Sequence, residues 1–212
     1  MPEENNIKAV IFDFDGTIAD TFALSIDIAL KLNDELKLIR SDEVSIEDFR
    51  STDTYDFIKK IGMPKWKLTY YIWKMRILMG NRIGDTKTFD GIPELLSALK
   101  KQGIKLAVVS SNSKSNLLTF FNKNNLNMFD VVESPLLILD KSKKISLAVK
   151  KLGVKPNESL YVGDETRDIL NAHQAGVKAV SVTWGYHFRE LLVRFHPDYT
   201  IDTPKELLKI VT

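Results

Sequence analysis

The sequence predicts a doubly wound α/β fold, in which a parallel sheet forms the core and an α-helical domain is inserted after the first strand. Short apolar runs that end in polar residues alternate with amphipathic stretches, which is typical of a parallel sheet with helices on both faces. Between about residue 20 and residue 84 the pattern is instead helical throughout. The length of 212 residues, 44% hydrophobic and 27% charged, is sufficient for one core with a smaller insertion.

The predicted strands share a compact apolar run with polar residues at its carboxyl end. The first is Lys8 to Phe12, which is followed by Asp13 and Gly16. The others are Lys105 to Val109, Asp130 to Val132, Ser159 to Val162 and Ala179 to Val182. Amphipathic stretches with helical spacing lie between them, and these are Pro93 to Lys101, Ser115 to Asn124, Ser142 to Leu152 and Thr166 to Ala175.

The inserted segment is predicted to form a helical cap over residues 19–84, which leaves residues 1–18 and 85–212 for the α/β core. Its helical stretches are Phe22 to Leu36, Ile46 to Ile61 and Pro64 to Gly80, with a loop at Arg50 to Asp53 inside the second. An aromatic and basic run from Trp66 to Arg76 has helical spacing and predicts packing within the cap. A unit of this size buries too little surface to be very stable alone, so we expect it to pack on the core as a lid over the strand ends.

Composition excludes several classes of protein. The formal net charge of +2 gives no electrostatic reason to expect nucleic acid or a membrane as a partner. The absence of cysteine excludes disulfides, thiolate metal sites and thiol nucleophiles, and fits a cytoplasmic protein. The N-terminal residues lack the pattern of a signal peptide, and no apolar stretch is long enough to cross a bilayer. We expect a monomer or a weak homodimer.

The polar residues at the strand ends should converge, because ligands of open α/β sheets bind outside the carboxyl ends of the strands. This set comprises Asp13 and Asp15, Ser110 and Ser111, Lys141 near a helix start, and Asp164, Glu165 and Asp168. Crowded carboxylates repel one another, so a cluster with one local lysine is stable mainly if it shares a divalent cation. Oxygen ligands without histidine or cysteine favour Mg²⁺.

A carboxylate nucleophile, a second acid, a metal and a lysine are the groups that phosphoryl transfer requires. Asp13 would attack a phosphate ester in line, and Asp15 would protonate the departing oxygen. Gly16 would let the backbone turn so that both carboxylates face one pocket. Ser110 and the amides after it suit a phosphate, and Ser111 and Asn112 could share this work, although a serine before a helix is also a common N-cap.

The same residues resemble the four motifs of the haloacid dehalogenase (HAD) superfamily. The motifs are Asp13-Phe14-Asp15-Gly16-Thr17 after a strand, Ser110, Lys141, and Gly163-Asp164-Glu165-Thr166-Arg167-Asp168 after a later strand. Order and spacing match over nearly the whole chain, and the helical insertion resembles the cap of that superfamily. Within it, the chain is most similar to phosphoglycolate-phosphatase-like members, including the stretch Val182-Thr183-Trp184-Gly185.

The resemblance implies a Rossmann-like core and a role for each motif residue. Asp13 would become an aspartyl phosphate, and Asp15 would act first as acid and then as base. Mg²⁺ would be held by the Asp13 carboxylate, the Asp15 backbone carbonyl and Asp164, with Asp168 ligating directly or through water. Ser110 would hydrogen-bond the phosphoryl group and Lys141 would hold it. The lysine motif departs from that of many relatives, so Lys143 and Lys144 remain alternatives to Lys141.

The predicted function is therefore Mg²⁺-dependent hydrolysis of a small phosphomonoester, with a phosphorylated metabolite as the partner. Phosphoglycolate, a sugar phosphate and a nucleotide monophosphate all remain possible substrates, and Arg50 in the cap is a candidate to read an anionic substrate. Two alternatives remain on the same fold. One is a phosphosugar mutase, although mutase relatives usually carry valine in place of Thr17, and the other is a non-catalytic binding or regulatory protein. Haloacid dehalogenase activity is disfavoured, because such members lack the acid at Asp15.

Overall fold

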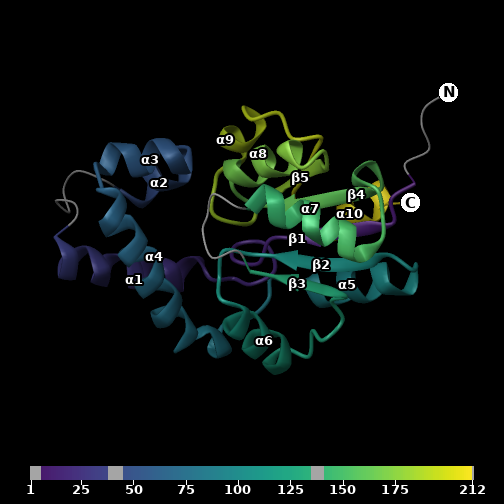
Figure 1. Ribbon diagram of the computed structural model, residues 1–212, viewed down its shortest axis with the longest axis horizontal. Coiled ribbons are helices and arrows are strands. Elements are labelled where there is room, and N and C mark those ends of the chain that lie inside the picture. The colour runs from purple at the N-terminus through teal and green to yellow at the C-terminus, as the bar shows by residue number, and fades with distance from the viewer. Residues whose placement is uncertain (1–5, 38–44, 135–140, 212) are drawn as a thin grey trace.

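The computed structural model describes residues 6–37, 45–134 and 141–211 and contains a six-stranded parallel sheet (Figure 1). The strands are β1 (Ala9–Phe12), β2 (Lys105–Val109), β3 (Val131–Glu133), β4 (Ser159–Gly163), β5 (Lys178–Val182) and β6 (Tyr199–Ile201). Their order is β3-β2-β1-β4-β5-β6. The strand order reverses between β1 and β4, and the carboxyl ends at such a reversal form a crevice suited to a ligand. The predicted doubly wound α/β class is confirmed.

Helices cover both faces of the sheet because successive strand residues point to opposite sides. Val10 and Phe12 belong to a core cluster that includes residues of α5 (Ile92–Lys101), α6 (Lys114–Lys123) and α10 (Pro204–Val211). Ala9 and Ile11 belong to a second cluster with residues of α7 (Lys141–Leu152), α8 (Thr166–Gln174) and α9 (Arg189–Val193). All four residues of β1 are fully buried, which explains the continuous apolar run.

Several short elements were not predicted. They are β6, the helices α9 and α10, and the 3-10 turns η1 (Ile83–Asp85) and η3 (Pro156–Glu158). The strand β6 has three residues and pairs with β5, so its sequence contains no run long enough to show a period. The predicted elements of the core lie where the sequence placed them, with boundaries that differ by one or two residues.

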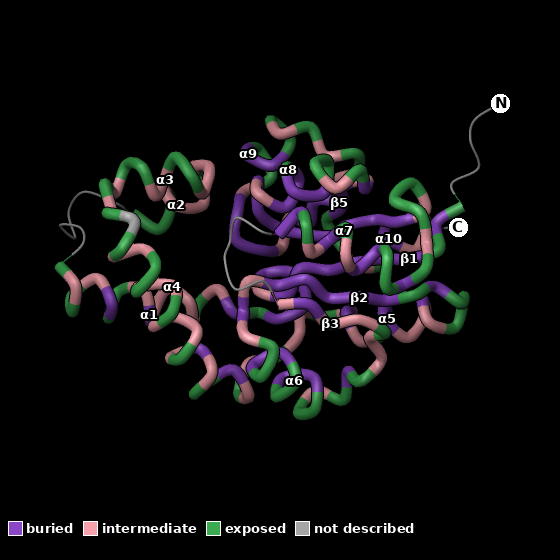
Figure 2. Tube along the Cα trace, in the orientation of Figure 1, coloured by how far each residue is buried: buried purple, intermediate pink, exposed green. Residues whose placement is uncertain are grey.

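In its described residues, the inserted segment contains α1 (Phe22–Leu36), α2 (Ile46–Ser51), α3 (Thr54–Ile61) and α4 (Lys65–Gly80). The stretch predicted as Ile46 to Ile61 is two helices, because the Asp53 side chain caps α3 by accepting from the N–H groups of Tyr55 and Asp56. Burial is concentrated in the sheet, whereas the cap helices are largely half-buried or exposed (Figure 2). The cap therefore depends on the core for part of its buried surface.

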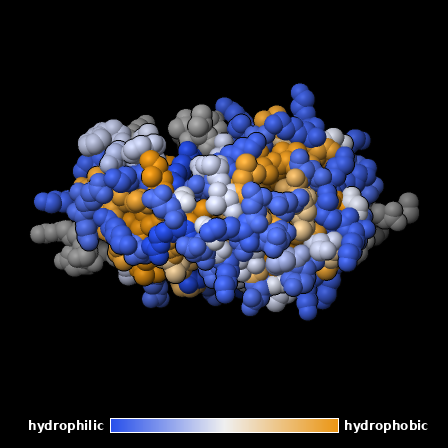
Figure 3. Space-filling model, turned by 90° about the horizontal axis from the view of Figure 1, so that it is seen from below, coloured by the Kyte–Doolittle hydropathy of each residue, from blue (hydrophilic) through white to orange (hydrophobic). Residues whose placement is uncertain are grey.

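The aromatic run of α4 does not pack as a unit. Tyr71 packs against the main core cluster, but Trp66 is 70% exposed and Trp73 is 55% exposed, so packing within the cap was the wrong prediction for the two tryptophans. Figure 3 shows hydrophobic side chains on the surface at the cap side of the molecule.

The two connections between cap and core run side by side. Ala19 forms an antiparallel bridge with Thr88, the N–H of Asp20 donates to the carbonyl of Lys87 (3.0 Å), and the N–H of Phe89 donates to that of Ile18 (3.1 Å). The predicted boundaries after residues 18 and 84 lie close to this paired segment.

Candidate active site

Asp13 follows β1 directly and lies at the carboxyl edge of the sheet. Its backbone N–H donates to the carbonyl of Val162 in β4 (2.8 Å), so the residue still follows the strand register. The side chain is buried, with Oδ1 accepting from the N–H of Phe14 (2.8 Å) and Oδ2 accepting from Nζ of Lys141 (2.7 Å). The Phe14 ring packs edge-on against Phe120, with centroids 4.9 Å apart, and this contact fixes the loop.

Asp15 lies two residues on and is half-buried. Its Oδ2 accepts from Nδ2 of Asn112 (3.1 Å), with a longer contact of 3.4 Å to Oδ1. The turn that follows requires glycine, because Gly16 has a φ of +77° and a Cβ there would lie 2.1 Å from Oδ2 of Asp164. Glycine is therefore required at position 16 for two reasons: the turn that the sequence predicted, and the close approach of the Asp164 carboxylate.

Lys141 begins α7 and is 1% exposed. Its Nζ lies 2.7 Å from Oδ2 of Asp13 and 2.6 Å from Oδ1 of Asp168, so it bridges two of the predicted site carboxylates. Lys144 instead pairs with Glu133 at 3.3 Å. Lys143 is exposed. The geometry therefore favours Lys141 among the three lysines that the sequence left open.

Asp164 and Asp168 come from the loop after β4 and the first turn of α8. Asp164 is fully buried, and its oxygens accept from the hydroxyl of Thr17 (2.6 Å) and the N–H of Tyr186 (2.8 Å). Asp168 is also buried, and its Oδ2 accepts from the N–H of Glu165 (3.0 Å). This capping bond explains why an acid stands in the first turn, and it leaves Oδ1 directed at Lys141.

Ser110 directly follows β2 and is fully buried, with its Oγ accepting from the N–H of Asn112 (3.0 Å). It is not the N-cap of α6, because Ser113 occupies that position and accepts from the N–H of Asn116 (3.2 Å). Ser111 is half-buried, and its carbonyl accepts from Nε of Arg76 (2.7 Å). The loop that bears both predicted phosphate-binding serines is therefore held by contacts from α6 and from the cap.

Burial dominates the electrostatics of the cluster. It raises the pKa of Asp13 to about 7, although the Lys141 charge opposes the shift. Burial also raises the pKa of Asp15 to about 6, against hydrogen bonds from Thr21 and Asn112. The pKa of Asp164 is raised well above its usual range by burial and by the charges of Asp168 and Glu165.

Glu165 shows the opposite behaviour. Burial disfavours its charge, yet Arg167 and His187 lower its pKa to about 2, and Nη2 of Arg167 donates to it at 2.5 Å. The sequence predicted no role for Arg167, because a basic residue within an acidic run is usually exposed at the surface. Its guanidinium, on a half-buried side chain, is a second cation of the cluster besides Lys141.

The residues of the cluster fit a divalent cation. Carboxylate oxygens of Asp13, Asp164 and Asp168 lie within 4.8 Å of one another, and all three residues are buried. Together with Asp15 and Glu165 they form a set of acids that outnumbers its two neighbouring cations, Lys141 and Arg167. Hard oxygen donors with an excess of negative charge are what Mg²⁺ prefers. Asp15 is outside the group of converging carboxylates, as expected if only its backbone carbonyl were a ligand.

The sequence matches the family model described as haloacid dehalogenase-like hydrolase over residues 10–182. The chain belongs to this family. The hydrolase class that the sequence predicted is therefore confirmed.

Among the relatives of this HAD-like hydrolase, the phosphoglycolate phosphatase of Synechococcus elongatus is 33% identical over 97% of this chain and 98% of the relative. Pyrophosphatase PpaX of Bacillus mycoides is 28% identical over 97% of each chain. Among solved structures, a haloacid dehalogenase-like hydrolase from Streptococcus pneumoniae superposes with a TM-score of 0.81 at 22% identity, over 99% of this chain and 100% of that one. The last similarity supports the fold.

In this HAD-like hydrolase, Arg50 lies in the last turn of α2 and contacts the core. Its Nε donates to the carbonyl of Tyr186 (3.0 Å) and its Nη2 to that of Gly185 (3.1 Å). The guanidinium also lies over the rings of Phe22 and Phe188, at 4.9 and 4.4 Å from their centroids. These contacts dock the cap on the core. Substrate reading by Arg50 stays a prediction, and two of its donor groups already have protein partners.

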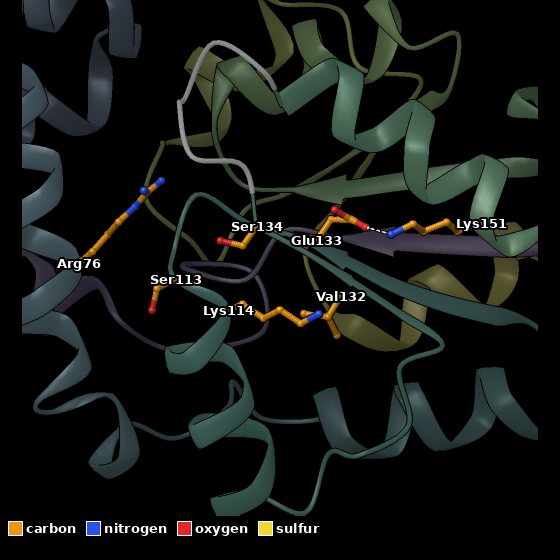
Figure 4. Close-up of a pocket in the computed structure, with 7 residues that line it drawn as sticks. All are labelled: Arg76, Ser113, Lys114, Val132, Glu133, Ser134 and Lys151. Carbon is orange, nitrogen blue, oxygen red and sulfur yellow. Dashed lines mark hydrogen bonds and ion pairs between the residues drawn. The ribbon is translucent and has the colours of Figure 1, made fainter.

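A cavity of about 420 Å³ lies between the cap and the carboxyl end of β3. It is lined by Arg76, Ser113, Lys114, Val132, Glu133, Ser134 and Lys151 (Figure 4). None of these seven was a predicted site residue, because they come from four elements and share no local motif.

In the described part of the chain, no helix has the length and apolar character needed to cross a membrane.

Proposed function

We propose that this HAD-like hydrolase is a Mg²⁺-dependent phosphatase that cleaves a small phosphomonoester through an aspartyl phosphate on Asp13. The observation that carries the proposal is the meeting of four site residues from three separate parts of the sequence. The Asp13 carboxylate lies 2.7 Å from Nζ of Lys141 and beside the carboxylates of Asp164 and Asp168. Relatives named phosphoglycolate phosphatase and pyrophosphatase support phosphate chemistry at this cluster.

In the first step, an oxygen of Asp13 forms a bond to phosphorus while the bond from phosphorus to the ester oxygen breaks. Asp15 donates its proton to that departing oxygen, and a pKa of about 6 allows it to exist in both protonation states near neutral pH. In the second step, Asp15 accepts a proton from the water that attacks the aspartyl phosphate, which releases phosphate and restores both carboxyl groups.

Lys141 and Ser110 would hold the phosphoryl group during both steps, with Ser111 as a neighbour on the same loop. A bound Mg²⁺, held by Asp13, Asp164, Asp168 and the backbone carbonyl of Asp15, would offset negative charge on the phosphoryl oxygens. We further propose that residues 19–84 act as a cap that closes over this site and excludes water.

The substrate class that we propose is a short phosphomonoester with a further anionic or hydroxyl group, such as phosphoglycolate or a sugar phosphate. The name of the relative that is 33% identical favours phosphoglycolate. Among the residues that line the cavity beside the serine loop, Lys151 is paired with Glu133, and Arg76 and Lys114 add positive charge, which would suit an anionic substrate.

The test is turnover of a panel that contains phosphoglycolate, sugar phosphates, a nucleotide monophosphate, pyrophosphate and p-nitrophenyl phosphate, with and without Mg²⁺. We expect Mg²⁺-dependent release of phosphate, and a loss of at least about 10⁴-fold in Asp13→Asn. Activity that is equal in Asp13→Asn would refute the nucleophile. If phosphate release fails while interconversion of phosphosugars succeeds, the mutase alternative replaces this proposal.

A further inference from the structure

Asn112 makes contacts that the proposed steps do not use. It lies in the loop between β2 and α6 and is 4% exposed. The sequence suggested that it shares phosphate binding with Ser110, but in the structure its Nδ2 donates to the Asp15 carboxylate, 3.1 Å from Oδ2. Asp15 thus receives a buried side-chain donor from a different strand end.

The orientation of the Asn112 amide is fixed by its other side. Oδ1 accepts from the N–H of Ser113 (2.9 Å) and from Nδ2 of Asn116 (2.8 Å). A flipped amide would place Nδ2 against two donors and Oδ1 against the Asp15 carboxylate, so all three partners select the same orientation. The amide of Asn112 therefore presents a donor to Asp15.

The backbone of Asn112 is held as well. Its N–H donates to Oγ of Ser110 (3.0 Å), and its carbonyl accepts from the hydroxyl of Ser134. With both backbone groups and both side-chain atoms bonded, the Nδ2 donor has little freedom to move relative to the sheet.

Asn116 extends this network to the cap. Its Nδ2 donates to Asn112 and also to the carbonyl of Arg76 in α4 (2.9 Å), and the residue is 7% exposed. Gly80 at the end of α4 makes room for it, because a Cβ there would lie 2.6 Å from Oδ1 of Asn116. One amide thus joins the cap helix to the residue that contacts Asp15.

We propose that Asn112 is a positioning residue, which turns the Asp15 carboxyl group so that its proton-bearing oxygen faces the departing ester oxygen. The inference rests on the proposed function, in which Asp15 is the general acid. Asn112 changes no bond itself. Asp13 bonds to phosphorus, the ester bond breaks, and the proton of Asp15 goes from Oδ1 to the leaving oxygen, while the Nδ2 donor, which is nearer to Oδ2 (3.1 Å) than to Oδ1 (3.4 Å), holds Oδ2. Asn116 supports this orientation from α4.

The test uses the dependence of the first step on its leaving group. p-Nitrophenolate leaves as a stable anion and needs no proton, whereas the alkoxide of an alkyl phosphate does. The ratio of kcat/KM for p-nitrophenyl phosphate to kcat/KM for phosphoglycolate therefore reports how well the acid is placed. Both values come from one enzyme preparation, so the ratio is independent of the fraction that is folded and active.

We expect the ratio to rise roughly tenfold or more in Asn112→Ala and in the isosteric Asn112→Asp, a part of the 10²–10⁴-fold that a general acid contributes. Asn116→Ala should raise it by less. The matched control is Asn122→Ala, an exposed asparagine in the same helix, which should leave it unchanged. An unchanged ratio in both Asn112 variants would overturn the inference. Failure of the proposed function looks different, since the wild-type protein would then release phosphate from neither substrate, or Asp13→Asn would release it equally.

Discussion

At the scale of single residues, the site concentrates buried carboxylates beyond what its own cations neutralise. Asp164 illustrates the cost, because burial and the charges of Asp168 and Glu165 raise its pKa well above the usual range. When ionised, such a buried carboxylate destabilises the folded state, and a bound cation offsets this destabilisation.

Replacing Asp164 by asparagine tests this balance without an activity assay. Asparagine can accept from the N–H of Tyr186 and donate to the Thr17 hydroxyl, which can reverse its role as donor. We expect Asp164→Asn to melt at or above the wild-type temperature without metal. The gain that saturating Mg²⁺ gives the wild type, about 2.7 kcal/mol at a hundredfold excess over Kd, should disappear.

The control for this experiment is Asp85→Asn, since the side chain of Asp85 is 85% exposed. It should keep the full Mg²⁺ effect. Equal stabilisation of wild type and Asp164→Asn by Mg²⁺ in thermal unfolding would contradict a metal site at Asp164.

The raised pKa values also predict how the stability of the metal-free protein depends on pH. Because the pKa is about 7 for Asp13 and about 6 for Asp15, the folded chain binds protons more tightly than the unfolded chain. Stability is therefore gained as the pH falls through these values and lost as it rises through them. Two groups act in the opposite sense: Glu165, with a pKa of about 2, does so only below about pH 4.5, and His187, whose pKa is lowered by burial, does so below about pH 6.5.

We expect the melting temperature in a metal chelator to be higher by at least about 4 °C at about pH 5 than at about pH 8. Calorimetry at several pH values measures it. A melting temperature that stays level or rises from about pH 5 to about pH 8 would show that the two carboxyl groups are not destabilised by burial.

At the scale of elements, contacts between the cap and the core decide how the site is closed. Arg50 at the end of α2 donates to two carbonyls of the loop after β5, and its guanidinium contacts the rings of Phe22 and Phe188. The sequence predicted that Arg50 lies in a loop of the cap, whereas it lies in the last turn of α2, and the sequence could not show which partners would reach the guanidinium.

The variant Arg50→Lys distinguishes two roles of Arg50, which are attachment of the cap to the core and recognition of the substrate. Lysine cannot donate to two carbonyls with the planar geometry of arginine, so docking predicts a loss of about 1–2 kcal/mol in the free energy of unfolding. A role in reading the substrate predicts instead a higher KM for anionic substrates with the stability unchanged. Chemical denaturation and steady-state kinetics on one preparation distinguish these outcomes.

Gly80 gives a second prediction for α4. Alanine in a helix is normally more stable than glycine by about 1 kcal/mol, but here its Cβ would meet the buried amide of Asn116. We expect Gly80→Ala to be destabilised. In the comparison variant Gly84→Ala, the Cβ meets the end of the exposed Lys123 side chain, which can move away, so its stability should change little. If Gly80→Ala gains stability, the close contact with Asn116 is absent.

At the scale of the whole molecule, the alternation of apolar and amphipathic segments was enough to predict the sheet. Strands such as β1 are buried on both faces, so their sequence is a continuous apolar run, and polar residues mark where each one ends. The short strand β6 lacked this signal. The site residues Asp13, Asp15 and Asp164 were predictable for the same reason, because they end strands that meet at one edge.

The parts that were not predictable depend on contacts across the molecule. Asn112, Asn116 and Arg76 stand on three elements, and each alone looks like an ordinary polar residue of a loop or helix. Only the fold brings α4 beside α6 and so joins the cap to Asp15. The cavity beside the serine loop is likewise assembled from separate elements and left no local pattern in the sequence.

The most direct test of the central claim is the structure of the protein with Mg²⁺ and beryllofluoride, which mimics a phosphoryl group on a carboxylate. The account predicts continuous density from one oxygen of Asp13 to beryllium, with Lys141 and Ser110 contacting the fluorides. Density for the adduct on another side chain, or its absence under saturating conditions, would contradict it.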